Sequence, residues 1–522
     1  MPASNQLDAL PVRGSRDELD SFAELQVQLT HQLKEWAPVG RNLPRSVVVV
    51  PSLSLDQQVV RKIAGAPFYE ERLLCLLMML RMPRTDVIYL TSQPVHPTII
   101  DYYLHLLPGI PVSHARRRLT LLCCHDNSAR PLTEKILERP RLIQRIRDKI
   151  QHPGSAYMNC FVTTEAERTL AVHLGIPLYG CDPALVHLGN KSNGRKVMRD
   201  AGIPIPDGRE GLRDRREMAE ALAAVKKRNP QLKRAVVKVN EGFSGEGNSL
   251  FYYNGCPTGD GLERWINNEL PSRLQFEARD EEWDKYHERF VAMGGVVECF
   301  IEGESKKSPN ARYHIDPLGT ITTMSVQDQI LGGPSGQIYL ACAFPADDAY
   351  RVEIQTMGMR ICELLRDRTV VGQIGIDFLC VRTQDRWINY GIEVNIRKGG
   401  ATHPFFMLQF LTDGNYDNET ATYRTSAGEP RCYYASDNLE NSSYRGLTPD
   451  DLIDIAVEND IHFHGATQQG VVFHLIGALS EFGKLGVVCI ADTPERALDS
   501  YRSTTEILDR EATRQGGPKC SS

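Results

Sequence analysis

The chain has 522 residues, of which 41% are hydrophobic and 24% charged, and its formal net charge is −6. At about 150 residues per domain, this length predicts roughly three domains with a large buried core. A slightly acidic chain has no general attraction to nucleic acid or to an anionic membrane, so we expect neither as a partner. The N-terminal stretch lacks the apolar segment of a signal peptide, and the 13 cysteines include no C-x-x-C pair. These features predict a cytoplasmic protein.

The N-terminal part alternates apolar strands with helical segments, after a polar lead-in over residues 1–40 that we expect to be loosely helical. Strands are predicted at Ser46–Val50, Asp86–Ser92, Leu119–Asp126 and Ala156–Thr164, with helices near Pro97–Leu107 and over Glu165–Leu174. Continuous apolar strands alternating with helices are typical of a parallel α/β sheet. We therefore expect a Rossmann-like domain over residues 1–186. No G-x-G-x-x-G follows its first strand, so dinucleotide binding is not predicted.

The order of elements changes after residue 186. The pattern predicts a helix in Asn190–Gly208, a strand–glycine loop–strand unit over Arg234–Tyr253, a strand in Gly294–Ser305, and an antiparallel pair at Thr369–Val381 and Trp387–Arg397. Residues 413–446 are polar and predicted to be loop-like, and Leu447–Glu511 predicts a small α+β unit before a disordered tail. We thus expect α/β and α+β domains at 1–186, 187–412 and 447–522, with a loop-rich connection at 413–446.

A glycine loop, "EGFSGEGN", follows the predicted strand that carries Lys238. Glycines at 242, 245 and 247 would let backbone N–H groups approach phosphate oxygens closely. The ammonium of Lys238 could reach phosphates beneath the loop. No Walker A motif occurs, and an ordinary hairpin is the alternative.

A row of polar residues marks the stretch "NYGIEVNIRKGG", Asn389–Gly400. Strand alternation predicts one face with Tyr390, Ile392, Val394 and Ile396, and the other with Glu393, Asn395 and Arg397. Asp377 lies in the preceding strand, close enough to converge with Glu393 and Asn395 on a hard cation such as Mg²⁺. Charges inside apolar strands are costly unless paired or metal-bound. The alternative is an exposed face with a Glu393–Arg397 salt bridge.

The order Lys191, Lys238, glycine loop, "VECFIEGE", Asp377 and Glu-x-Asn resembles the ATP-grasp superfamily of carboxylate–amine ligases over about residues 187–412. Within that superfamily, the segments "DQILGGPSGQIYL", "GIEVNIRKGGATHPF" and "GVVFHLIGALSEFGKLGVVCIAD" resemble peptide ligases of the pheganomycin type. The resemblance implies an ATP-grasp fold with a Rossmann-like pre-ATP-grasp domain and a characteristic C-terminal domain.

The resemblance also implies a nucleotide site. Its ATP ligands would be the phosphate-binding Lys191 and Lys238, the loop Gly242, Phe243, Ser244, Gly245, Glu246 and Gly247, the adenine-contacting Glu298, Cys299 and Ile301, and the ribose-binding Glu304. Asp377, Glu393 and Asn395 would hold one or two Mg²⁺ ions, for which Mn²⁺ can substitute.

One departure from the family pattern concerns an arginine that several members carry two residues before the first metal acid, where this chain has Gly375. Arg397 and Arg312 are the candidates to stabilise transition-state charge instead, although a structural strand arginine is the alternative for Arg312. Arg397 could also fork onto the substrate carboxylate. The N–H groups of Gly399 and Gly400 could stabilise a tetrahedral oxyanion.

Two further residues are candidates for substrate contact: His403, whose alternative is a role at a helix start, and Ser335, whose alternative is a plain turn. His462 and His464 alternate as metal ligands can, but the sequence suggests no third ligand.

The resemblance implies an ATP-dependent ligase that joins a small carboxylate, such as an amino acid or modified amino acid, to an amine or peptide acceptor through an acyl phosphate. ADP and phosphate would be released, and a homodimer is compatible with this superfamily. Two alternatives stay open. One is an ATP-grasp enzyme with another acceptor, either a carboxylate kinase or a thiol or ammonia ligase. The other is a degenerate ATP-binding regulatory protein.

Overall fold

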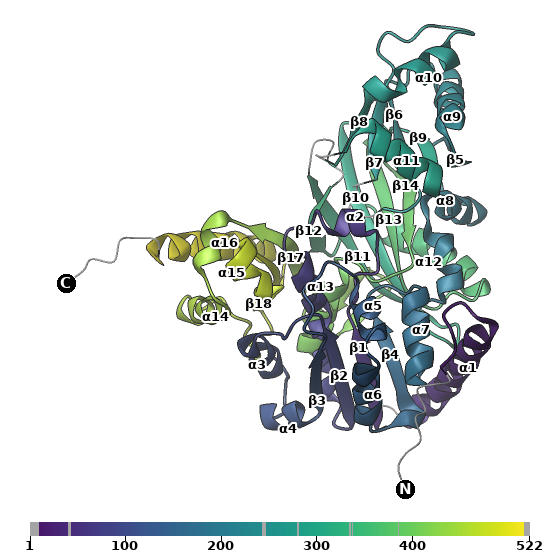
Figure 1. Cartoon of the computed structure of the whole chain (residues 1–522). Helices are drawn as coiled ribbons and strands as arrows, with labels where there is room; N and C mark the ends of the chain where they lie inside the picture. The colour runs from purple at the N-terminus through teal and green to yellow at the C-terminus, as the bar shows by residue number, and fades with distance from the viewer. Residues whose placement is uncertain are drawn as a thin grey trace.

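The N-terminal domain is built on a parallel sheet of four strands in the order β3-β2-β1-β4 (Figure 1). The computed structural model describes residues 10–39, 43–242, 247–278, 281–332, 336, 338–384 and 386–515. The strands are β1 (Arg45–Val50), β2 (Thr85–Thr91), β3 (Leu119–Cys123) and β4 (Ala156–Cys160). The helices are α1 (Arg16–Val39), α2 (Gln57–Val60), η3 (Ala66–Arg81), α3 (Pro97–His105), α4 (Val112–Arg117), α5 (Leu132–Leu137), α6 (Pro140–Lys149), η4 (Pro153–Ser155) and α7 (Glu165–Leu174).

Local sequence signals explain where α7 begins and ends. The Thr164 side chain accepts a hydrogen bond from the Ala166 N–H, and the Glu167 carboxylate accepts one from the Thr164 N–H. This capping box satisfies N–H groups that the first helical turn leaves unpaired. Gly175 ends the helix with a left-handed φ of 68°. The predicted parallel α/β layer is confirmed.

An antiparallel sheet of five strands, in the order β5-β9-β6-β7-β8, forms the upper part of Figure 1. Its strands are β5 (Gly208–Leu212), β6 (Arg234–Val239), β7 (Asn248–Tyr252), β8 (Leu274–Phe276) and β9 (Gly295–Cys299). The helices of this region are η5 (Pro183–Gly189), α8 (Lys191–Asp200), α9 (Arg215–Arg228), α10 (Leu262–Arg273) and α11 (Trp283–Met293).

A sheet of eight strands, in the order β14-β13-β10-β11-β12-β17-β19-β18, runs through the rest of the molecule. Its strands are β10 (Ser305–Ile315), β11 (Ile321–Gly332), β12 (Ile338–Phe344), β13 (Gly372–Thr383), β14 (Arg386–Asn395), β17 (Cys432–Glu440), β18 (Gly470–His474) and β19 (Lys484–Ala491). The other elements are α12 (Arg351–Asp367), α13 (Thr402–Thr412), β15 (Asn415–Asp417), β16 (Thr422–Arg424), η6 (Ser442–Gly446), α14 (Pro449–Glu458), η7 (Ile476–Ala478), α15 (Leu479–Phe482) and α16 (Pro494–Gln515).

The expectation that residues 413–446 are loop-like is wrong for β17. This strand pairs with β12 on one side and β19 on the other, so it joins the predicted C-terminal unit to the central strands in one sheet. Its sequence is polar because Asp437 and Asn438 face a cavity rather than a core. A strand with such residues lacks the apolar alternation on which the prediction relied.

A β-bulge in β14 changes the predicted faces of that strand. The register shifts between Asp377 and Phe378, so Phe378 pairs with Gly391 and Ile392 becomes the extra residue. Gly391 packs toward α8, where an added Cβ would lie 2.6 Å from the Met198 sulfur. Ile392 lines a cavity, so its predicted place on the apolar face is wrong.

The largest apolar core joins the N-terminal domain to the C-terminal strands. Leu77 of η3, Leu408 of α13 and Val472 of β18 belong to the same buried cluster. The apolar run of Leu73–Leu80 is therefore a core element. Within the described ranges, none of the helices combines the length and apolar character needed to cross a bilayer.

Candidate active site

A cavity of about 1160 Å³, here called the main cavity, is lined by residues of the five-stranded and eight-stranded sheets and by residues of the N-terminal domain. Small-molecule sites commonly occupy about 300–1,000 Å³, so it has room for a nucleotide and a second substrate. Of the residues predicted to act, its walls include Lys238, Glu298, Cys299, Ile301, Arg312, Asp377, Glu393, Asn395, Arg397, Gly399 and Gly400.

The three predicted metal ligands converge on one end of the β13–β14 pair. Asp377 lies opposite Glu393, and the Asn395 side chain donates a hydrogen bond of 2.9 Å to Asp377 Oδ2. Asp377 Oδ1 accepts hydrogen bonds from Asn310 at 2.6 Å and Gln329 at 2.5 Å. Burial, together with the neighbouring Glu393, raises the pKa of Asp377.

Glu393 is held by the first residue of α8. The Lys191 ammonium donates to Glu393 Oε1 at 2.6 Å. Burial opposes ionisation of Glu393, but Lys191 outweighs it and holds the pKa of that carboxyl below its usual value. Lys191, a predicted phosphate ligand, and Glu393, a predicted metal ligand, are therefore in direct contact.

The donor set fits Mg²⁺. Two carboxylates and a carboxamide on adjacent strands offer the oxygen ligands that this hard cation prefers. The raised pKa of Asp377 shows that its negative charge is incompletely compensated, and a cation between Asp377 and Glu393 would compensate it.

Lys238 belongs to a buried charge triad. Its ammonium contacts one oxygen of Glu298 at 2.6 Å, and the guanidinium of Arg195 contacts the other at 2.5 Å. Burial opposes ionisation of Glu298, but the two cations hold its pKa below the usual value. Arg195 is also paired with Glu210 at 3.3 Å, so Lys238, which lines the cavity, is the cation that suits phosphate. Both oxygens of Glu298 thus have basic partners, and Glu298 also lines the main cavity, so its contact with the base stays a prediction.

The other predicted nucleotide ligands are placed unequally. Cys299 and Ile301 line the main cavity, whereas Glu304 is exposed just before β10 and is not part of its wall. Gly242 and Gly247 close the base of the glycine loop, where a Cβ on Gly242 would lie 3.5 Å from the Gly247 Cα. Residues 243–246, which include the predicted Phe243, Ser244, Gly245 and Glu246, lie outside the described residues, as does Ser335.

Arg312 stands beside the glycine that replaces the family arginine. It pairs with Gly375 across β10 and β13, and a Cβ on Gly375 would lie 3.5 Å from Arg312 Nη1. Its Nη2 donates to Gln373 at 3.1 Å and to Thr402 at 2.6 Å. Burial lowers the pKa of Arg312 to about 10, so the side chain stays charged at neutral pH.

Arg397 is half-buried and has no hydrogen bond or ion pair with any described residue. Burial lowers the pKa of Arg397, and the nearby Glu393 and Asp377 oppose that shift. The neighbouring Gly399 N–H donates to Thr402 Oγ1 at 3.0 Å and is thus already paired. The Gly400 N–H has no partner within the described ranges, which leaves it as the better candidate for an oxyanion.

The structure corrects the expectation that His403 contacts a substrate. Its side chain is 3% exposed, lies outside the cavity walls and stacks on His474 with ring centroids 4.2 Å apart. Its Nδ1 hydrogen-bonds the Arg72 carbonyl at 3.1 Å. Burial lowers the pKa of His403 to about 4. The alternative, a role at the start of α13, agrees with these contacts.

Sequence reasoning missed several residues of the site. Asn310 and Gln329 hold Asp377, and Arg72, Asp437 and Lys484 line the end of the main cavity away from the five-stranded sheet, where Arg72 forms an ion pair with Asp437. Two sequence signals could have pointed to some of them. Gln329 is one of the polar residues at alternate positions of the strand segment "SVQDQ", and Arg72 directly precedes the apolar run Leu73–Leu80.

A third candidate ligand lies beside His462 and His464. Each of these and Asp460 offers a ligand atom, all within 4.8 Å of one another, and Asp460 pairs with His464 at 2.9 Å. The left-handed φ of Asp460, 53°, turns the chain so that the three meet, which the sequence pattern did not reveal.

The chain is similar to known proteins in two regions and over most of its length. The IQCH-like ATP-grasp family matches residues 264–419, and the PGM1 C-terminal domain family matches residues 451–504. L-propargylglycine–L-glutamate ligase of Streptantibioticus cattleyicolor is 28% identical over 469 residues, 88% of this chain and 93% of that protein. IQ motif-containing protein H of Danio rerio is 25% identical over 380 residues, 64% of this chain but only 36% of that protein.

Solved structures share the fold at low identity. Biotin carboxylase from Campylobacter jejuni superposes with a TM-score of 0.53 at 13% identity, covering 92% of this chain and 96% of that one. The biotin carboxylase domain of 2-oxoglutarate carboxylase from Hydrogenobacter thermophilus, solved with Mg·ADP and bicarbonate, gives a TM-score of 0.51 at 14% identity, covering 91% and 95%. Together with the family match over residues 264–419, these likenesses show that the chain has the ATP-grasp fold.

Proposed function

We propose that the protein is an ATP-dependent ligase that joins a carboxylate to the amine of an amino acid or peptide through an acyl phosphate. One observation carries the proposal: a single cavity contains the acids suited to Mg²⁺ and, on the same strand end, an arginine without a partner among the described residues. Arg397 follows Asn395 by two positions, so a carboxylate bound by its guanidinium would lie next to a nucleotide phosphate held at Asp377 and Glu393.

In the first step, a carboxylate oxygen attacks the γ-phosphorus of ATP, the bond from that phosphorus to the bridging oxygen breaks, and ADP leaves. Mg²⁺, when bound, would neutralise charge on the phosphates. The chain's own contribution is to orient: Lys238 and Lys191 supply ammonium groups at the phosphate end, and Arg397 fixes the attacking carboxylate. Such positioning is most of what phosphoryl transfer requires.

In the second step, the amine nitrogen attacks the acyl carbon, a tetrahedral oxyanion forms, the carbon–oxygen bond to phosphate breaks, and the nitrogen loses a proton to solvent. The Gly400 N–H and the Arg312 guanidinium are the donors that would stabilise the oxyanion. An amino acid as substrate is supported by the name of the Streptantibioticus relative, an amino acid–glutamate ligase.

The test is phosphate release with Mg·ATP and pools of carboxylic acids and amines, followed by mass spectrometry of products. The proposal expects release only when an acid and an amine are both present, with a product mass equal to their sum minus water. Release with acid alone would identify a carboxylate kinase, and release with an acid and a thiol or ammonia would identify one of the other ligases. Tight ATP binding without turnover in any pool would identify a regulatory protein. Light scattering on the same preparation tests whether the chain forms a homodimer.

A further inference from the structure

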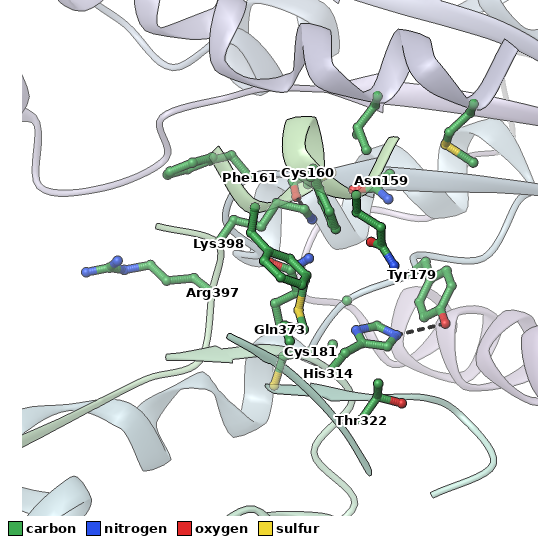
Figure 2. Close-up of a pocket in the computed structure, with 18 of the residues that line it drawn as sticks. Asn159, Cys160, Phe161, Tyr179, Cys181, His314, Thr322, Gln373, Arg397 and Lys398 are labelled. Carbon is green, nitrogen blue, oxygen red and sulfur yellow. Dashed lines mark hydrogen bonds between the residues drawn. The ribbon is translucent and has the colours of Figure 1, made fainter. Parts of the chain in front are cut away.

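A second cavity, of about 520 Å³, lies behind the strand end that carries Arg397 (Figure 2). Its walls come from η3, the end of β4, α13 and the ends of β10, β11 and β13. Phe161 and Arg397 line both this cavity and the main cavity, so the two share a wall. A molecule in the second cavity would thus be next to the residue proposed to hold the attacking carboxylate.

Consecutive residues point into the two cavities. Figure 2 shows the Arg397 guanidinium extending away from the residues that surround the second cavity, whereas Lys398 extends among them. Both residues follow the end of β14, and Arg397 lies at a bend of the chain. Arg397 therefore belongs to the phosphoryl-transfer side and Lys398 to the second cavity.

Lys398 is a buried cation without an acid. Its side chain is 7% exposed, and its ammonium donates to the Cys160 carbonyl at 2.5 Å. In the described part of the chain no carboxylate pairs with it, and two of its three N–H donors have no hydrogen bond. Burying a charge is costly unless an opposite charge compensates it. An anionic group of a ligand would supply that compensation.

Other polar atoms in the wall are also unsatisfied. Asn159, Thr163 and Thr323 line the second cavity, and their side-chain oxygens have no hydrogen-bond partner among the described residues. These oxygens are themselves closed off from solvent, so they do not face the open volume of the cavity. They are therefore not contacts for a ligand, which leaves Lys398 as the polar group that calls for one.

The remaining wall is mainly apolar. Leu76, Met79, Phe405, Phe406 and Phe410 contribute side chains to it. A ligand that matches this surface has a carboxylate for Lys398 and an apolar body. An α-amino acid with an apolar side chain has both.

We propose that the second cavity binds the amine substrate, an α-amino acid with an apolar side chain whose carboxylate pairs with Lys398. Its α-amine then faces the wall shared with the main cavity, where the acyl phosphate forms. This inference rests on the proposed ligase function for the chemistry, but binding itself can be measured without turnover.

A purely structural role for Lys398 has to be separated by the test. The Lys398 N–H donates to the Phe161 carbonyl at 3.3 Å, and its ammonium to Cys160, so the residue also ties its segment to the N-terminal sheet. If Lys398 only holds this segment in place, its loss should weaken the binding of every ligand alike. Loss of an ion pair would weaken only ligands that carry the carboxylate.

The experiment is calorimetry on the full chain without ATP, with L-leucine, L-phenylalanine and L-leucinamide as probes. The wild type is expected to bind the two amino acids at least 10-fold more tightly than the amide. In Lys398→Met this preference should disappear, whereas Lys196→Met, a change of an exposed lysine on α8, should keep it. If Lys398→Met does not fold, Phe406→Ala provides the second test, because it enlarges the cavity and should shift preference from leucine toward phenylalanine.

Steady-state turnover then distinguishes the proposed amine site from the proposed ligase function. The inference expects Lys398→Met to raise KM for the amine at least 10-fold without raising KM for ATP. Ligation with an unchanged KM for the amine would overturn the inference and leave the ligase function standing. Binding of apolar amino acids that depends on Lys398, without ligation in any pool, would support the site and refute the ligase.

Discussion

Moving the arginine from β10 to β13 tests whether Arg312 replaces the family arginine that is absent at Gly375. The perturbation is Arg312→Ala, alone and combined with Gly375→Arg. A Cβ on Gly375 would lie 3.5 Å from Arg312 Nη1, which is ordinary contact, so a side chain as long as arginine has to share the space beside that guanidinium. Gly375→Arg alone should therefore crowd Arg312, whereas in the Arg312→Ala background the new guanidinium has that space available.

The magnitude follows from the buried position of the guanidinium. Arg312 is 3% exposed, and removal of one preorganised donor from such a site costs about 3–4 kcal/mol of transition-state stabilisation, a fall of roughly 100- to 1,000-fold in kcat. Gln373 and Thr402 each lose a hydrogen bond to a charged group, at about 1.5–3 kcal/mol per bond, so the unfolding free energy should fall by about 3–6 kcal/mol. The double variant should recover at least 10-fold of the lost kcat.

The assay is steady-state phosphate release with Mg·ATP and a substrate pair found in the screen, with thermal unfolding measured in parallel. Arg366→Ala, a change of an exposed arginine on α12, serves as the control and should leave both quantities unchanged. A kcat of Arg312→Ala within 10-fold of the wild type would refute the reasoning. So would a double variant that unfolds like the wild type but gains nothing over Arg312→Ala.

Three further predictions concern charges. Asp377→Asn removes one of the two facing carboxylates, so the Mg²⁺ concentration that gives half-maximal turnover should rise about 100-fold. The same half-maximal Mg²⁺ concentration in both proteins would contradict the metal site. Glu298→Gln leaves its two buried basic partners without a shared anion and should lower the unfolding free energy, measured in urea, by about 3 kcal/mol. The control is Asp207→Asn, which breaks the exposed pair with Arg228 and should cost under about 1 kcal/mol; equal effects would contradict the triad. Burial raises the pKa of Glu71, which accepts a hydrogen bond from the Gly477 N–H, to about 8. The folded state therefore favours the neutral form, and stability falls as pH rises from about 4.5 through 8, by at most about 5 kcal/mol. In Glu71→Gln this fall should be absent, and parallel melting-temperature profiles for both proteins would show the assignment to be wrong.

Local periodicity predicted the part of the site that two neighbouring strands build. Asp377 and Glu393 are opposite each other because alternation and a short polar turn fix that pairing. The bulge at Ile392 was not predictable, since it depends on how Gly391 packs against α8. The far end of the main cavity was also missed, because Arg72 and Asp437 meet only through the tertiary fold.

Non-local packing also decided the residues whose roles differ from expectation. His403 follows a glycine pair that suggests a substrate pocket, but the core places it against His474, which lies in a strand far along the chain. The polar sequence of β17 hides a central strand for the same reason: its neighbours in the sheet come from distant segments. Patterns within a window of ten residues carry no information about such partners.

The eight-stranded sheet has a consequence for protein engineering. The strands that carry Asp377 and Glu393 and those of the C-terminal unit belong to one hydrogen-bonded sheet, with β17 in between. A chimaera that exchanges the C-terminal unit at residue 446 would separate β17 from β19 and leave an open edge on each fragment. An exchange point between β16 and β17 would keep β17, β19 and β18 together and break only the β12–β17 pairing of this sheet, so that the swapped piece carries its own side of the cavity with it.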